Sequence, residues 1–276
     1  MDKYAVVGNP IDHSLSPQIH AAFATQTAQD MSYQAIQLDS ENFNQQIREL
    51  QSSGYSGVNV TVPFKQMAWE LADKLSPRSK DAGATNTLLF QADGLIVGDN
   101  TDGIGLSRDL IVNHQVLIEH RKILILGAGG AVRGVLGPLL AKKPHSLIIA
   151  NRSIEKAQQL VEDFAHVGEL RATTYEDLGA DKFDLIINGT SAGLNKEVPP
   201  IPDEILGINS ICYDMMYSGS EPTAFVQWAT DRGALRAYDG VGMLVEQAAE
   251  SFFLWRGVRP STAEVIDQLS FKNASN

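Results

Sequence analysis

Short apolar runs alternate with segments of helical spacing along almost the whole chain, which predicts an α/β fold with mainly parallel sheets. Phe43, Ile47 and Leu50, for example, recur at helical spacing. Ala92-Asp-Gly94 predicts a hairpin turn. In the first part of the chain we expect strands at residues 4–8, 33–38, 57–62, 87–90 and 95–97, and helices at 16–26, with Ser16 as N-cap, 41–51 and 64–75.

The later part of the chain repeats strand–helix units and ends in two helices with no strand between them. The pattern therefore predicts a first domain at residues 1–102, a second at 103–240 and C-terminal helices at 241–276. The expected strands are 122–126, 146–150, 183–188 and 210–214, and the expected helices are 103–113, 154–164, 223–232, 243–255 and 261–269.

Composition narrows the range of partners. The chain has 276 residues, of which 43% are hydrophobic and 20% charged, as in an ordinary globular protein. A net charge of −11 argues against nucleic acid or an anionic membrane as the main partner, although a local basic pocket still permits an anionic small-molecule substrate. The single cysteine, Cys212, stands in an apolar stretch and is expected to be a buried thiol.

Targeting and metal-binding signals are not recognisable in the sequence. The first residues lead directly into a strand-like run, without the pattern of a signal peptide, and no apolar run nears the roughly 18 residues that span a bilayer. We therefore expect a cytoplasmic protein. The six histidines are scattered without ligand spacing, so we expect no metal site.

A glycine-rich turn follows the strand at 122–126. In Ile123-Leu-Ile-Leu-Gly127-Ala-Gly129-Gly130-Ala-Val-Arg133, Gly127 allows a tight turn, and Gly129 lets backbone N–H groups approach a pyrophosphate at a helix N-terminus. The usual fingerprint has Gly or Ala where this chain has Val132. A simple tight turn is the alternative, but the preceding strand and the βαβ spacing favour a dinucleotide site.

The end of the next strand predicts which dinucleotide binds. NAD sites usually have Asp or Glu there, whereas this chain has Ala150-Asn151-Arg152-Ser153-Ile-Glu-Lys156. Arg152 is suited to a forked, charge-assisted contact with a 2′-phosphate, with Asn151, Ser153 and Lys156 beside it. The alternative is that Arg152 is only a solvated charge at a helix start. We predict NADP.

Two charged residues end polar runs in the first domain. Lys65 closes Asn59-Val-Thr-Val-Pro-Phe-Lys65, and Asp102 closes Gly98-Asp-Asn-Thr-Asp102. A lysine and an aspartate at neighbouring strand ends are able to handle the proton of a carbinol.

Further polar residues suggest a pocket for a small polyhydroxylated acid. Ser14 and Ser16 either cap a helix or present hydroxyls and N–H groups to a carboxylate. Asn59 and Thr61 share one face of a strand, and Asn86 stands in Ala84-Thr-Asn-Thr87. Each of these three either lines a site or belongs to a buried network.

Taken together, these motifs resemble the shikimate dehydrogenase family. The resemblance also rests on Gly8-Asn-Pro10, Ser14-Leu-Ser-Pro17, Gly83-Ala-Thr-Asn86, Tyr213-Asp-Met-Met-Tyr217 and Asp239-Gly-Val-Gly-Met-Leu-Val-Glu-Gln-Ala248, and it runs in order from residue 4 to about residue 257. It implies reversible, NADPH-dependent reduction of 3-dehydroshikimate to shikimate. It also implies an N-terminal substrate-binding domain to which the C-terminal helices return, and a Rossmann-type NADP-binding domain.

The resemblance further implies a role for each matching residue. Lys65 and Asp102 would be catalytic. Ser14, Ser16 and Tyr217 would bind the substrate carboxylate, and Asn59, Thr61, Asn86 and Gln247 would complete the substrate site with the catalytic pair. Gly127, Ala128, Gly129, Gly130 and Ala131 would bind the pyrophosphate, Asn151, Arg152, Ser153 and Lys156 the 2′-phosphate, and Thr190, Ser191, Met215, Gly240 and Met243 the rest of the cofactor.

Two departures and three rival functions stay open. Gly189 stands where Ala or Thr is expected, and Pro77 where related chains often have an acidic residue. A quinate/shikimate dehydrogenase of broader specificity is less favoured because of Arg152, and a non-catalytic NADP-binding regulator would need neither Lys65 nor Asp102. A methylene-tetrahydrofolate type of dehydrogenase would not need the paired serines. The sequence leaves monomer and homodimer equally open.

Overall fold

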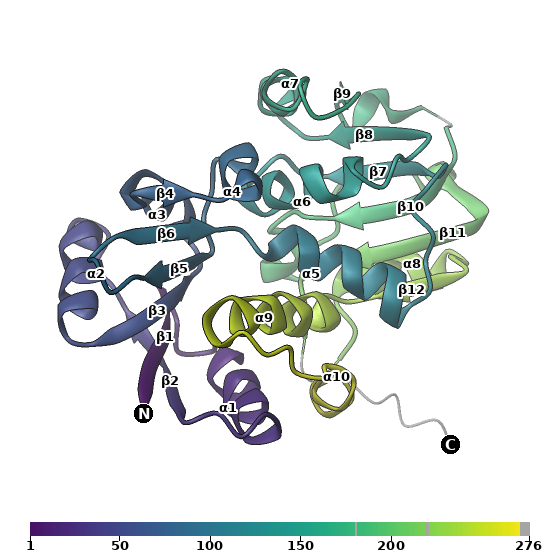
Figure 1. Cartoon of the computed structure of the whole chain (residues 1–276). Helices are drawn as coiled ribbons and strands as arrows, with labels where there is room; N and C mark the ends of the chain where they lie inside the picture. Colours follow the sequence, from purple (N-terminus) through teal and green to yellow (C-terminus); the bar gives the residue numbers. More distant parts are fainter. Residues whose placement is uncertain (180, 219–220, 271–276) are drawn as a thin grey trace. The chain divides into compact units, whose positions relative to one another are not determined.

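The computed structural model describes residues 1–179, 181–218 and 221–270, and it divides into two compact units. The first unit contains Met1–Gly105 and Leu244–Val265, and the second contains Leu106–Met243 and the chain from Ile266 onward. In the part described, each unit is built on a six-stranded sheet (Figure 1). The predicted α/β fold class is confirmed.

The sheet of the first unit is mixed and has the order β2-β1-β3-β5-β6-β4. Strand β1 runs parallel to β2 and β3, whereas β5 is antiparallel to both β3 and β6. The register pairs Asn59 with Thr87 and Thr87 with Asp99, which places three polar residues in one row across the sheet. The strands are β1 Asp2–Gly8, β2 Met31–Gln37, β3 Tyr55–Val60, β4 Lys74–Leu75, β5 Thr87–Phe90 and β6 Ile96–Asp99.

Apolar faces of the helices and strands build the core of the first unit, where Val7, Phe43, Phe64, Leu88 and Ile96 are buried together. The helices that belong to it wholly or mainly are α1 Ser16–Gln26, α2 Phe43–Ser52, α3 Lys65–Leu71, α4 Pro77–Ala82, α5 Asp102–Arg108 and α9 Val241–Arg256, the last from Leu244 onward.

The helix expected at residues 64–75 is wrong in its second half. Helix α3 ends at Leu71, and the next residues turn into the short strand β4, which pairs with β6. Asp73 stabilises this change, because its N–H donates to the Ile96 carbonyl at 2.9 Å and its carboxylate accepts from the Ile96 N–H at 2.7 Å. Contacts with a distant strand thus outweigh the local helical pattern.

The sheet of the second unit has the order β12-β11-β10-β7-β8-β9, and its strand pairs are parallel. This is the doubly wound order, in which strands are added outward on one side from β7 and on the other side from β10. Ligands bind beyond the carboxyl ends of the strands at this switch point. The strands are β7 Lys122–Leu126, β8 Ser146–Ala150, β9 Arg171–Thr173, β10 Phe183–Asn188, β11 Leu206–Asp214 and β12 Arg236–Tyr238.

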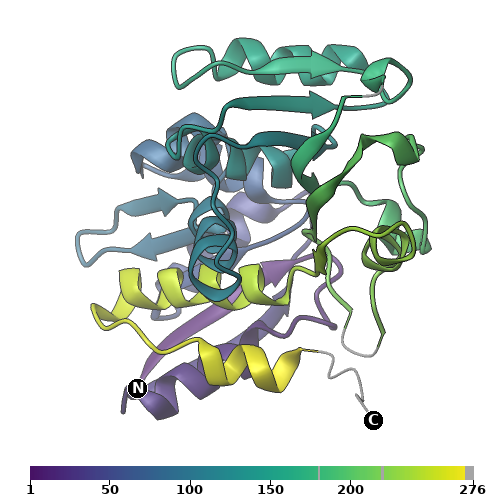
Figure 2. The same cartoon turned by 90° about the vertical axis from the view of Figure 1, so that its right-hand side faces the viewer.

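Helices cover this sheet. The helix residue Leu136 is buried together with the strand residues Ile123, Ile125 and Leu185. Helix α7 packs on β8 and β9 (Figure 2). The helix expected at 103–113 is α5 followed by a π-helical turn. The three-residue strands β9 and β12 were not predicted, because so short a run carries no clear alternation. The helical elements are the π turn Asp109–Asn113, α6 Gly130–Leu140, α7 Ile154–Asp163, the 3-10 turns Glu176–Leu178, Ala192–Asn195 and Asp203–Ile205, α8 Ala224–Asp231 and α10 Ala263–Leu269.

Candidate active site

Lys65 and Asp102 form an ion pair within the first unit. Lys65 is the first residue of α3 and Asp102 the first of α5, and Lys65 Nζ lies 2.6 Å from Asp102 Oδ2. The Lys65 side chain is 21% exposed and that of Asp102 8%. The carboxylate is therefore buried, whereas the ammonium keeps some access to solvent or to a bound molecule.

Asn86 holds the second oxygen of the same carboxylate. Its Nδ2 donates to Asp102 Oδ1 at 2.8 Å and to Thr101 Oγ1 at 2.9 Å, and its Oδ1 accepts from the Thr101 N–H at 2.8 Å. Both oxygens of Asp102 are thus engaged, one by an amide and one by the ammonium. The lysine cannot turn away without leaving a buried carboxylate short of a partner.

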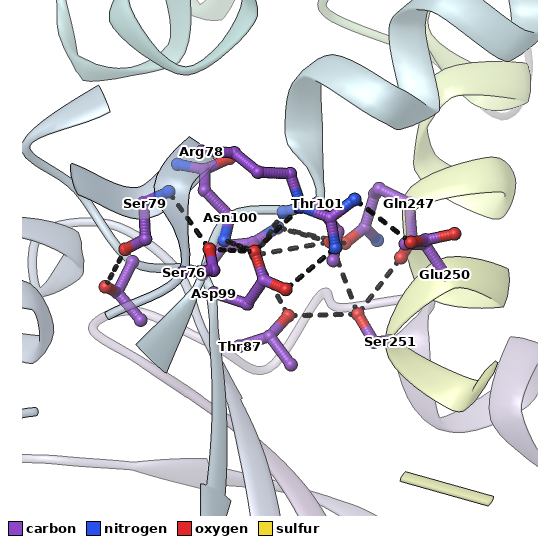
Figure 3. A network of polar contacts seen from close by, with 12 residues as sticks. Ser76, Arg78, Ser79, Thr87, Asp99, Asn100, Thr101, Gln247, Glu250 and Ser251 are labelled. Carbon is purple, nitrogen blue, oxygen red and sulfur yellow. Dashed lines mark hydrogen bonds and ion pairs between the residues drawn. The ribbon is translucent and has the colours of Figure 1, made fainter. Parts of the chain in front are cut away.

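Helix α9 brings Gln247 and Ser251 to this cluster from the far end of the chain. Gln247 Oε1 lies 3.3 Å from Asn86 Nδ2. Thr101 Oγ1 lies 3.4 Å from Gln247 Oε1 and 3.3 Å from Ser251 Oγ (Figure 3). We call Asn86, Thr101, Gln247 and Ser251 the neutral network. It joins the start of α5 to α9.

Asn59 belongs to a buried network of its own. It accepts from Tyr33 OH at 2.8 Å and donates to Ser251 Oγ at 2.9 Å and Thr87 Oγ1 at 3.0 Å. Of the two alternatives that the sequence left open, the structure favours the network. Thr61, two residues further, is partly exposed. A substrate contact of either residue stays a prediction.

The two serines near the start of α1 differ in exposure: Ser16 is 7% exposed, and Ser14 is half-buried. The prediction that Ser16 is the N-cap is wrong. The N-cap is Leu15, and the Ser16 N–H lies 3.3 Å from Ser14 Oγ. Tyr217 belongs to the second unit, where burial raises the pKa of its hydroxyl. That these three residues bind one carboxylate stays a prediction.

The glycine-rich turn of the second unit fits a pyrophosphate. Gly127 has φ +100°, a conformation that favours glycine, and Gly129 is the N-cap of α6. A Cβ added at Gly129 or Gly130 would meet no atom within 4 Å, so the start of α6 is open to a ligand. Ala128 is half-buried and Ala131 exposed beside them. The first N–H groups of an 11-residue helix are suited to an anion there.

Two exposed cations follow the carboxyl end of β8: Arg152 in the turn and Lys156 in the first turn of α7. Asn151 Nδ2 donates to the Ser153 carbonyl at 2.8 Å and shapes the turn before α7. Ser153 Oγ donates to Glu155 at 2.8 Å, so a phosphate contact by Ser153 would compete with this bond. The two cations fit the 2′-phosphate of NADP.

Asn188 and Asp214 are buried polar residues that the sequence analysis missed. They end the adjacent strands β10 and β11, and Asn188 Nδ2 donates to Asp214 Oδ1 at 3.0 Å. Asn188 Oδ1 accepts from Thr190 Oγ1 at 2.8 Å, and the Asn188 carbonyl accepts from the Met215 N–H at 2.8 Å. The pair therefore orders two loops with predicted cofactor contacts. A polar residue at the end of an apolar strand was the available signal.

The start of α9 is held closely in the second unit. The Gly240 N–H donates to the Met216 carbonyl at 2.9 Å, and a Cβ at Gly240 would lie 2.4 Å from the Met215 carbonyl oxygen. The Met243 N–H lies 3.3 Å from Tyr213 OH. Thr190 and Met215 are half-buried, Ser191 is exposed, and Met243 is 8% exposed. These predicted cofactor residues thus border the carboxyl ends of β10 and β11.

Val132, which departs from the usual dinucleotide fingerprint, and Gly189, which stands where Ala or Thr is expected, compensate each other. A Cβ at Gly189 would lie 2.5 Å from Val132 Cγ2, so the valine fills the space that a larger residue at 189 would take. The fingerprint change at one position thereby explains the change at the other. Cys212 is buried, and burial raises the pKa of its thiol to about 12.

Comparison with known proteins identifies the family. Family models match at residues 6–88, as the shikimate dehydrogenase substrate binding domain, at 110–195, as shikimate/quinate 5-dehydrogenase, and at 240–269, as the shikimate 5′-dehydrogenase C-terminal domain. The chain belongs to the shikimate dehydrogenase family, and the predicted resemblance is confirmed.

Relatives match over nearly their whole length. A protein of Alkalilimnicola ehrlichii named shikimate dehydrogenase (NADP(+)) is 54% identical over 97% of this chain and 98% of its own. An Ael1 enzyme from Pseudomonas putida has a TM-score of 0.93 at 46% identity, covering 98% of this chain and 99% of that one. Shikimate 5-dehydrogenase from Thermus thermophilus, in complex with NADP(H) and shikimate, has a TM-score of 0.87 at 31% identity, covering 98% and 100%.

The described residues contain neither a candidate membrane-spanning helix nor a candidate metal site. Within residues 1–179, 181–218 and 221–270, no helix is long and apolar enough to cross a membrane. Over the same residues, no group of three or more His, Cys, Asp or Glu side chains is placed to hold a metal ion.

Proposed function

We propose that this chain catalyses the reversible, NADPH-dependent reduction of 3-dehydroshikimate to shikimate. The observation that carries the proposal is the 2.6 Å contact between Lys65 Nζ and Asp102 Oδ2, with Asn86 on the other carboxylate oxygen. Relatives that are 54% and 56% identical bear the name shikimate dehydrogenase (NADP(+)), which supports both substrate and cofactor.

Lys65 is the proton donor in this proposal. When bound, NADPH supplies the hydride to the C3 carbonyl carbon of 3-dehydroshikimate. The Lys65 ammonium stabilises the negative charge that develops on the carbonyl oxygen and gives it a proton, and in the reverse reaction Lys65 accepts that proton. Asp102 holds the ammonium in place, and Asn86 holds Asp102.

The remaining residues bind and orient the two molecules. We assign the substrate carboxylate to Ser14, Ser16 and Tyr217, and the ring hydroxyls to Thr61, Asn86 and Gln247. Asn59 acts through the hydrogen bonds it makes to Thr87 and Ser251. Gly127 to Ala131 bind the pyrophosphate, Asn151, Arg152, Ser153 and Lys156 the 2′-phosphate, and Thr190, Ser191, Met215, Gly240 and Met243 the rest of NADP. A cytoplasmic location and a monomeric or homodimeric state stay predictions.

A spectrophotometric assay of nicotinamide reduction tests the proposal, with shikimate or quinate crossed with NADP or NAD. We expect turnover mainly with shikimate and NADP. Quinate turnover with NAD at a similar rate would instead favour a quinate/shikimate dehydrogenase of broader specificity, whose name the central family model also includes.

The Lys65→Met variant tests the role of the lysine. We expect kcat to fall by about 10²- to 10⁴-fold with a much smaller change in the KM for shikimate, because the proton transfer is lost and most binding contacts remain. Lys74→Met, at an exposed position of β4, is the matched control and should keep its activity. Normal turnover in Lys65→Met would reject the mechanism.

A further inference from the structure

Arg78, on the short helix α4, binds two buried carboxylates at once. Its Nε donates to Asp99 Oδ1 at 2.8 Å and its Nη2 to Asp99 Oδ2 at 2.7 Å, which is a two-pronged contact. Its Nη1 donates to Glu250 Oε1 at 3.1 Å (Figure 3). One guanidinium thus joins the end of β6 to α9, and its partner Glu250 lies 172 positions further along the chain than Arg78.

The surroundings of this contact are largely buried and balanced in charge. The side chains of Asp99, Arg78 and Glu250 are 9%, 25% and 8% exposed. The other Glu250 oxygen binds Arg259, and Asp99 Oδ1 also accepts from Ser76 Oγ at 2.6 Å. Asp99, Arg78, Glu250 and Arg259 form what we call the ionic network, with two charges of each sign.

The ionic network holds the charged form of Asp99. Burial alone opposes ionisation, but the hydrogen bonds from Arg78 and Ser76 and the positive charge of Arg78 outweigh it, so the pKa of Asp99 lies below its usual value. The guanidinium is therefore needed where it stands, because its loss would leave a buried charge uncompensated.

The ionic and neutral networks connect the same two segments. Asp99 precedes Asp102 by three residues, and Glu250 follows Gln247 by three residues on the same face of α9. Asn86 touches both Asp102 and Gln247, while Arg78 touches both Asp99 and Glu250. The contact that Arg78 makes between Asp99 and Glu250 thus lies three residues from Asp102 on one segment and three residues from Gln247 on the other. It limits how far Asp102 can move away from α9.

We propose that Arg78 is a positioning residue of the substrate site, which sets the placement of Asp102 relative to α9 by holding Asp99 and Glu250 together. Arginine is required for this task. Lysine keeps the charge but lacks the planar fork that binds one carboxylate with two N–H groups while a third reaches another. The inference rests on the proposed function, in which Asp102 holds the catalytic ammonium.

Steady-state kinetics of the Arg78→Lys variant with shikimate and NADP test the proposal. We expect kcat to fall about tenfold or more, because small displacements of a catalytic group are costly, while the KM for shikimate changes less than about threefold. The Kd for NADP should be unchanged, since the residues assigned to NADP belong to the second unit.

Two further variants make the test specific. Glu250→Gln weakens the other end of the contact and should lower kcat in the same way, which also covers the case in which Arg78→Lys does not fold. Arg48→Lys is the matched control, because Arg48 pairs with Asp73 in the same unit at 3.5 Å and is 43% exposed. Its kcat should equal that of the wild type.

A double-mutant comparison shows whether Arg78 acts through Asp102. In an Asp102→Asn background, Arg78→Lys should lower kcat by less than about twofold, because the placement of Asp102 no longer matters. Full additivity would overturn the proposal. So would a lower melting temperature with unchanged kcat at 25 °C, which is what a purely structural arginine produces. A wild type inactive on shikimate with NADP would overturn the proposed function as well, whereas a normal kcat in Arg78→Lys overturns this inference alone.

Discussion

The two units balance their buried carboxylates in different ways. In the first unit Asp99 meets the guanidinium of Arg78, and Asp102 meets the ammonium of Lys65. In the second unit Asp214 receives hydrogen bonds from Asn188 Nδ2, Thr223 Oγ1 and the Met216 N–H. The pKa of Asp99 therefore lies below its usual value, whereas burial, opposed only in part by these hydrogen bonds, raises the pKa of Asp214 to about 6.

This difference follows from what each unit has to do in the proposed reaction. A proton-transferring ammonium has to be held by a charged partner, as Asp102 holds Lys65, and the amide of Asn86 holds that partner in turn. The second unit only has to order backbone loops around NADP. Neutral donors, such as the three that bind Asp214, are sufficient for that.

Replacing one buried aspartate by asparagine in each unit should give the largest difference in the free energy of unfolding. We expect Asp99→Asn to lower the free energy of unfolding by about 3 kcal/mol at pH 7, because it leaves a buried guanidinium with one partner fewer. Asp214→Asn should cost about 1 kcal/mol or less, since the new amide keeps the oxygen that accepts from Asn188 and Met216. Equilibrium unfolding in urea measures both. Equal losses would mean that the two sites do not differ as described.

Close packing at glycines gives the second contrast between the units. A Cβ at Gly189 would meet the side chain of Val132 at 2.5 Å, whereas a Cβ at Gly57 would meet the Leu88 carbonyl oxygen and Trp255 Nε1, each at 2.5 Å. We expect Gly189→Ala to cost about 2 kcal/mol, and the added Val132→Ala to restore about 1 kcal/mol of it by making room.

Gly57→Ala is the comparison for this cycle. It should cost at least as much as Gly189→Ala, because the backbone of a paired strand cannot move aside as a side chain does. Unfolding curves of Gly189→Ala, Val132→Ala, the double variant and Gly57→Ala decide the point. Simple additivity of the changes at 189 and 132 would show that the two positions are not coupled.

Mild acid should give the smallest effect, and of the two carboxylates compared only Asp214 should respond to it. The fold favours the protonated form of Asp214, so its stabilising contribution is present below the usual pKa of 3.8 and is lost as the pH rises through about 6. Lowering the pH from 7 to 5 should therefore stabilise the wild type relative to Asp214→Asn by about 1 kcal/mol.

The matching measurement at Asp99 has the opposite sign and another window. A lowered pKa contributes stability above the usual value that is lost only as the pH falls through the lower folded value. The difference between Asp99→Asn and the wild type should thus stay constant from pH 7 to pH 5. A slope there, or none for Asp214→Asn, would contradict the contrast between the units.

Local signals in the sequence predicted much of the fold. The strands at 122–126, 146–150 and 183–188 and the hairpin at 92–94 are marked by apolar runs and turn residues, and the structure has them at those positions. The helix expected at 64–75 failed because Asp73 pairs with Ile96, a contact that no local pattern records. The same limit explains why β9 and β12, which are edge strands of three residues, were missed.

The sequence by itself determined the family, the glycine-rich turn after β7 and the candidate pair of Lys65 and Asp102, because each lies in a contiguous motif. Only the tertiary structure decided that Asn59 binds Ser251, that Val132 fills the space beside Gly189, and that Arg78 joins Asp99 to Glu250. These contacts link distant segments, and the free energy of burying a charge or filling a cavity depends on neighbours that chain order does not reveal.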